Sequence, residues 1–184
     1  MEELYEVDLQ KRVYFWLPAV VTALVHNLIH ESVHYFAARL FREEVLEFRF
    51  LSNGWGTSQV IFATPPGERV GVHWLVIAWA PAVVTVLIGY VIYVNRKRWW
   101  TQWRLVNGGI WYAALFFLCL DPFYLAVLSL LFGGDVNAVA AVGWSPWPVR
   151  LVALVLFAFN AWLMVRWWRE ARAHPERYPV AGKA

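Results

Sequence analysis

The sequence predicts an all-α integral membrane protein with about four transmembrane helices and a small membrane-associated β-hairpin between the first and the second. Three observations point to this fold class. Of the 184 residues, 60% are hydrophobic and only 16% are charged, whereas about 25% are charged in soluble domains. Several apolar runs reach 17 residues or more, and a helix of about 20 apolar residues crosses a bilayer. Between the first two runs, apolar and polar residues alternate, which is typical of strands.

The apolar runs bound the expected helices within a single membrane-embedded domain, residues 1–184. These runs are residues 13–38, 70–94, 105–132 and 149–165. As one helix, the third run would rise about 42 Å, more than the roughly 30 Å hydrocarbon core of a bilayer. We therefore expect a break at 121–122, where Asp121 would cap a new helix that begins at Pro122. The basic residues 166–184 are expected to form a polar tail.

The polar interval predicts a β-hairpin over residues 45–62. The segments VLEFRFL and TSQVIF both alternate, and Asn53-Gly54 between them is a strong signal for a two-residue turn. The alternative is a plain interfacial loop. Because the alternation and the turn agree, we favour a hairpin that packs against the membrane surface or dips into it.

The second half of the first run carries four ionisable side chains: His26, His30, Glu31 and His34. Ionisable groups are costly at membrane depth, so by default they indicate function. Residues 30–34 form the HExxH pattern. Residues four apart share one face of a helix, so the two imidazoles of this pattern can bind one metal ion. Glu31 lies about 100° around the helix from His30, near enough to polarise a metal-bound water.

The alternative is that these histidines are packed inside a helix bundle or a water-filled cavity without a metal. Idle ionisable groups are expensive in an apolar segment, which favours the metal. His26 lies one turn before His30. It can be a ligand, a residue that contacts the ligands from behind, or a packed core histidine, and we favour the last two.

A third ligand is expected from an aspartate. The third run ends on the same side of the bundle as the first, which brings Asp121 and Asp135 within reach of the histidines, whereas Asp8 precedes the first run. The two candidates are nearly even. The glycines before Asp135 allow a close approach of the backbone and tip the balance slightly toward it. Two imidazoles and a carboxylate suit Zn²⁺, with one ion per chain.

Charge and cysteine usage exclude other classes. The formal net charge is +3, but the basic residues lie at the ends of apolar runs, where they anchor helices to lipid headgroups; no nucleic-acid partner is expected. The single cysteine, Cys119, excludes an internal disulfide and a cysteine-based zinc cluster. The acidic N-terminus does not fit a removable signal peptide. Lys and Arg predominate on the side of both termini, which predicts cytoplasmic termini and a site nearer the outer face.

The combination of an HExxH pattern, a following hairpin, an Ala-Pro in the second run and a Gly-Gly-Asp after the third resembles a family. It is similar to membrane-embedded zinc metallopeptidases of the site-2 protease type, and most nearly to the small zincin peptidases related to them. The resemblance implies zinc held by His30, His34 and Asp135, with Glu31 as the general base. It also implies a site toward the cytoplasm, contrary to the charge count. Asn137, the nearest asparagine to Asp135, is the candidate for contacting the ligands from behind.

The resemblance implies cleavage of peptide bonds in or near transmembrane segments of a membrane protein or peptide substrate, by a multi-pass protein of the cell membrane. A helical substrate must unwind, and the strand with Leu46, Phe48 and Phe50 is expected to bind it as an added strand. One alternative is a non-catalytic zinc-binding membrane adaptor or scaffold of the same fold. A metal or proton conduit is least favoured, because the second and fourth runs offer few polar residues beyond Thr85 and Asn160.

Overall fold

The computed structural model describes the backbone of residues 2–51, 58–174 and 178, and the side chains of these residues other than 2–11 and 141. In chain order the elements are α1 (Glu2–Leu40), β1 (Val45–Arg49), β2 (Gln59–Phe62), the 3-10 turn η1 (Pro66–Glu68), α2 (Val72–Trp99), α3 (Arg104–Phe123), the π-helical segment η2 (Tyr124–Leu128), α4 (Ser129–Phe132), the 3-10 turn η3 (Gly134–Val136), α5 (Asn137–Ala141) and α6 (Trp147–Ala173).

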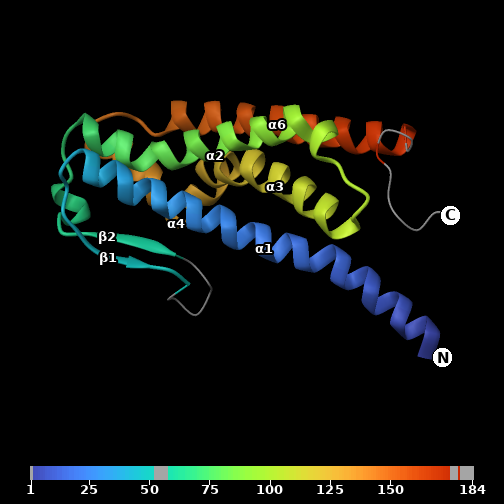
Figure 1. Ribbon diagram of the computed structural model, residues 1–184. Helices are drawn as coiled ribbons and strands as arrows, with labels where there is room; N and C mark the ends of the chain where they lie inside the picture. The colour runs from blue at the N-terminus through green and yellow to red at the C-terminus, as the bar shows by residue number, and fades with distance from the viewer. Residues whose placement is uncertain (1, 52–57, 175–177, 179–184) are drawn as a thin grey trace.

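The predicted helical architecture is confirmed at the level of its elements. Four helical stretches in the described chain are long and apolar enough to cross a membrane by length and composition: 12–40, 72–99, 104–132 and 147–173. α3 contacts α1, α2 and α6 and so occupies the middle of the bundle. The start of α1 and the end of α6 lie at one end of the molecule and the strands β1 and β2 lie near the other (Figure 1). The end of α1, the hairpin and the turn after α4 therefore share one end of the bundle.

α6 extends further than the apolar run predicts, because polar residues 166–173 continue the helix to Ala173. Two ion pairs hold this end of α6 on α2: Glu170 pairs with Arg96 at 2.9 Å and with Lys97 at 2.7 Å. Within α6 itself, Arg172 lies over the ring of Trp168, 3.8 Å from its centroid. Hydropathy detects only the apolar part of such a helix, so the first part of the expected polar tail, residues 166–173, is in fact helical.

The expected break at Asp121-Pro122 is wrong, because α3 runs through both residues and Asp121 caps no helix. Pro122 has no N–H, which leaves the carbonyl of Leu118 without its helical partner. Asn160 of α6 replaces that partner, since its Nδ2 donates to Leu118 O at 2.6 Å. Tyr90 of α2 donates in turn to Asn160 Oδ1 at 2.7 Å. A neighbouring helix thus supplies the hydrogen bond that Pro122 removes from α3. The backbone departs from α-helical geometry just after Pro122, in the π-helical segment η2.

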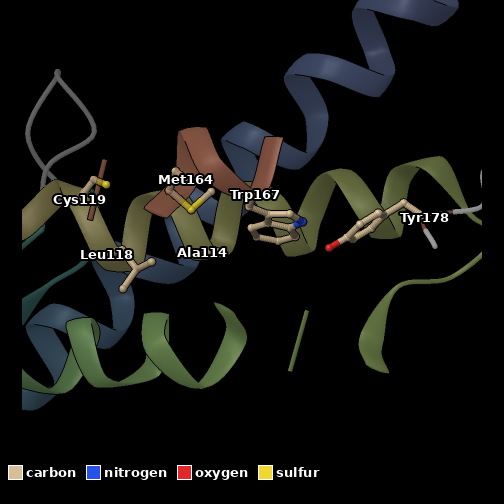
Figure 2. Packing of buried hydrophobic residues seen from close by; sticks show 6 residues of the cluster. All are labelled: Ala114, Leu118, Cys119, Met164, Trp167 and Tyr178. Carbon is tan, nitrogen blue, oxygen red and sulfur yellow. The ribbon is translucent and has the colours of Figure 1, made fainter. Parts of the chain in front are cut away.

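Small residues let the central helices approach closely. A Cβ on Gly89 of α2 would lie 2.8 Å from Leu118 Cγ and 2.9 Å from the Leu118 backbone nitrogen, so α2 packs directly against the backbone of α3. Figure 2 shows the main apolar cluster, with Ala114, Leu118 and Cys119 of α3 beside Met164 and Trp167 of α6. Tyr178 extends this cluster beyond the end of α6, and its ring meets Trp100 edge-on at 5.1 Å.

The predicted hairpin is confirmed as a two-stranded antiparallel sheet in which Phe48 lies opposite Val60. The Asn53-Gly54 turn falls outside the described residues. The base of the hairpin is fixed to the bundle by a second apolar cluster, in which Val45 and Phe62 pack on Ala38, Trp74 and Ile77. In Figure 1, β2 lies between β1 and α1. The hairpin is therefore fixed against the end of α1 that carries the HExxH pattern.

Replacing Asn160 by leucine, which has a similar volume, should destabilise the bundle. The change leaves the Leu118 carbonyl and the Tyr90 hydroxyl without their partner, and a buried unsatisfied group costs about 1–3 kcal/mol. The free energy of unfolding in detergent measures the loss.

Two variants sharpen this test. Pro122→Ala supplies an N–H for the Leu118 carbonyl within α3, so Asn160→Leu should cost less in the Pro122→Ala background than in the wild type. Phe159→Leu alters a half-exposed neighbour and should change stability little. An equal cost of Asn160→Leu in both backgrounds would contradict the role assigned to Pro122.

Candidate metal centre

Three side chains from two distant segments converge at the hairpin end of the bundle. His30 and His34 lie one turn apart on α1, and Asp135 lies in η3. His30 Nε2 is 3.6 Å from Asp135 Oδ2, and His34 Nε2 is 3.5 Å from Asp135 Oδ1. One ligand atom of each residue lies within 4.8 Å of the other two. Ligands about 2.0–2.1 Å from a tetrahedral zinc are separated by about 3.3 Å, so these three residues fit one such ion.

The orientation of both imidazoles is set by acceptors on their other nitrogen. His34 Nδ1 lies 2.8 Å from the carbonyl oxygen of Ile77. A carbonyl only accepts, so His34 carries a hydrogen on Nδ1 and leaves Nε2 available for a second proton or a metal ion. His30 Nδ1 lies 3.2 Å from Asp121 Oδ2, which favours the same arrangement. Both Nε2 atoms thus face the carboxylate of Asp135, and a cation between them would hold the three groups together.

That cation can be a proton or a metal ion. When protons are present, the two histidines donate to Asp135. Burial by itself would raise the pKa of Asp135, but the hydrogen bonds from His30 and His34 outweigh it and lower the pKa to about 2. Asp135 is therefore ionised at neutral pH, as a metal ligand must be.

Asp121, the alternative third ligand, lies on the opposite side of His30 from Asp135. Its Oδ2 accepts a hydrogen bond from the hydroxyl of Thr85 at 2.5 Å. The same oxygen lies 3.2 Å from His30 Nδ1. A carboxylate that holds the distal nitrogen of a histidine is a common support of metal-binding histidines. His26 Nε2 lies 3.5 Å from the same oxygen without hydrogen-bonding geometry. Both Asp121 and His26 are thus buried behind His30 and outside the three-residue cluster.

Glu31 lines a cavity of about 430 Å³ together with His34 and Asp135. Its Oε2 accepts a hydrogen bond from the backbone N–H of Val60 in β2 at 3.1 Å. Asn137, two residues after Asp135, also lines this cavity. The carboxylate of Glu31 therefore borders the same space as His34 and Asp135.

The strand next to the cavity is β2 and not β1, which differs from the expectation. Among the described residues, Val60 of β2 lines the cavity, whereas Leu46, Phe48 and Phe50 do not. Leu46 and Phe50 are exposed. Because the Val60 N–H points to Glu31, the pair with Phe48 is a non-hydrogen-bonded one, and the free edge of β2 faces the site. Alternation in sequence is the same for both strands and cannot distinguish them.

Sequence analysis missed Tyr124 and Arg69, which also line the cavity. Tyr124 lies in the π-helical segment, and its hydroxyl donates to the Gly133 carbonyl at 3.3 Å. Such segments are frequent at functional sites, but no sequence pattern marks this one. The Arg69 guanidinium lies 5.0 Å from the ring centroid of Trp74, and its Nε donates to Thr64 O at 3.0 Å.

The Gly-Gly turn before Asp135 requires glycine. Gly133 and Gly134 have φ angles of 69° and 82°, which most side chains disfavour. A Cβ on Gly134 would overlap the Tyr124 hydroxyl, and one on Gly133 would lie 2.6 Å from Asn137 Nδ2. The turn therefore brings Asp135 to the histidines by a path that only glycine permits.

Gly134→Ala should displace Asp135 and weaken metal binding. The matched control is Gly143→Ala, because Gly143 has a similar φ of 77° but a Cβ there would meet no atom within 4 Å. Both variants carry the backbone cost of about 1–2 kcal/mol, and only Gly134→Ala adds the overlap with Tyr124. Zinc affinity, measured by competition with a chelator, should fall for Gly134→Ala alone; equal affinities would contradict this account of the turn.

Comparison with known proteins adds no family to these observations. No family model matches the chain, and neither a curated protein nor a solved structure matches it. The functional interpretation therefore rests on the donor atoms, partners and burial of the residues described above.

Proposed function

We propose that this chain is a multi-pass membrane zinc metalloprotease that cleaves peptide bonds in or near transmembrane segments. The observation that carries the proposal is the pair of imidazole Nε2 atoms directed at Asp135, with Glu31 in the adjoining cavity. Four helices with the length and composition of membrane spans support a location in the cell membrane. The ligands in this proposal are His30, His34 and Asp135. A zinc ion held by three protein ligands keeps an open position and acidifies the water bound there.

In this proposal Glu31 is the general base. It takes a proton from the attacking water and later delivers one to the leaving amine, so its carboxylate must stay directed into the cavity. The Val60 N–H holds Glu31 Oε2 in that direction. Asp121 and the Ile77 carbonyl keep the histidines oriented from behind. The Tyr124 hydroxyl lies on the same cavity wall and would have to leave the Gly133 carbonyl to donate to a substrate carbonyl.

Substrate binding is proposed at the free edge of β2. A transmembrane helix must unwind before cleavage, because its carbonyls are hydrogen-bonded within the helix. An unwound segment can pair as a third strand with the backbone groups at this edge of β2 that Glu31 does not occupy. Because Val60 of that edge also touches Glu31, a strand bound there would run directly past the general base.

Ligand variants separate this function from its alternatives. His30→Ala and Asp135→Ala should lose zinc, measured as metal content of purified protein, whereas Asp121→Ala should keep the site with about 10–100-fold lower affinity. Glu31→Gln should retain zinc but lower cleavage by about 10²–10⁴-fold. Cleavage is measured by comparing membrane-peptide fragments in cells that carry wild type or Glu31→Gln. An unchanged fragment pattern with zinc bound would instead support the non-catalytic adaptor.

Proline substitutions test which strand binds substrate. Val60→Pro places a proline ring at the β2 edge that faces the site and also removes the N–H that holds Glu31, so cleavage should fall for both reasons while zinc content is unchanged. Phe48→Pro is the matched control, because Phe48 lies opposite Val60 and its N–H points to the outer edge of β1. If Phe48→Pro alone lowers cleavage, the binding edge is β1 and the proposal for β2 is wrong.

A further inference from the structure

Pro81 lies fully buried in the middle of α2, four residues after Ile77. In a regular helix, the carbonyl of Ile77 would accept from the N–H of residue 81. Proline has no N–H, and its ring clashes with the carbonyl four residues earlier, which turns that carbonyl away from the helix axis. The sequence therefore exposes one backbone acceptor of α2, on a helix that packs against α1.

That carbonyl is the group that accepts from His34 Nδ1 at 2.8 Å. We infer that Pro81 is a positioning residue for the metal centre: it frees the Ile77 carbonyl, which fixes His34 with its hydrogen on Nδ1 and its bare Nε2 toward Asp135. Without this acceptor, the buried imidazole of His34 is free to carry its hydrogen on Nε2, the atom that must be bare to bind a metal. The consequence for zinc rests on the proposed function; the consequence for the tautomer does not.

The other prolines in the interior of described long helices provide a comparison. Pro122 of α3 also frees a carbonyl, that of Leu118, and a side chain of another helix takes it, but this partner is Asn160, away from the metal cluster. Pro18 lies near the middle of α1, about three turns before His30, and packs on α3, where a Cβ on Gly108 would lie 3.2 Å from its Cγ. Of the three prolines, Pro81 is thus the one whose freed carbonyl reaches a residue of the cluster.

The test is Pro81→Ala in the full chain, purified in detergent. Alanine restores an N–H that competes for the Ile77 carbonyl, and it is the best helix former, so α2 should remain folded. Two quantities are measured: zinc affinity, and the ¹⁵N resonances of His34 in zinc-free protein, which report the tautomer. We expect affinity to fall about 10–100-fold and the Nδ1–H of His34, which the Ile77 carbonyl holds in the wild type, to be lost from part of the protein. Pro18→Ala is the control and should change neither.

The outcomes separate this inference from the proposed function. Unchanged zinc affinity and an unchanged Nδ1–H form in Pro81→Ala would overturn the inference. A loss of zinc affinity without a change of tautomer would also overturn it, because Pro81 would then act through the shape of α2. If the wild type binds no zinc but Pro81→Ala still shifts the His34 tautomer, the proposed function fails and the positioning by Pro81 stands.

Discussion

The hydrogen bond between His34 Nδ1 and the Ile77 carbonyl is the interaction on which the site depends. It determines the tautomer of one metal-binding candidate and links α1 to α2 at the level of the cavity. In apolar surroundings a polar group must find its partner within the protein, so each ionisable residue of α1 needs a specific acceptor on a neighbouring helix. Asp121 provides the second acceptor, for His30, and Thr85 of α2 holds Asp121 in place.

Prolines have a constructive role in this bundle. Each of Pro81 and Pro122 removes one backbone donor from a long helix and so leaves one carbonyl for a side chain of another helix. At Pro122 the carbonyl binds Asn160 and joins α3 to α6. At Pro81 it binds His34 and belongs to the candidate metal centre. The same chemical defect therefore stabilises the bundle at one position and orients a functional side chain at the other.

The hairpin and the Gly-Gly turn complete the site from opposite sides. β2 supplies the Val60 N–H to Glu31, and the turn at Gly133 and Gly134 delivers Asp135 to the histidines. Both are anchored to the ends of the long helices, the hairpin through its apolar base and the turn through Tyr124. One edge of β2, Glu31 and two residues of the metal cluster, His34 and Asp135, therefore border one cavity, and the proposed peptide hydrolysis would take place there.

The sequence by itself determined the features that arise from short-range patterns. Apolar runs predicted the four long helices, alternation predicted the hairpin, and HExxH placed two histidines on one helix face, because these patterns depend only on residues within a few positions of one another. Tertiary structure decided which aspartate faces Nε2 and which supports Nδ1, since that depends on how α3 is rotated and on the π-helical segment after Pro122. It also decided that β2 borders the cavity, that Asn160 donates to the Leu118 carbonyl that Pro122 leaves free, and that Tyr124 lines the cavity. These choices depend on partners distant in the chain, and no local period encodes them.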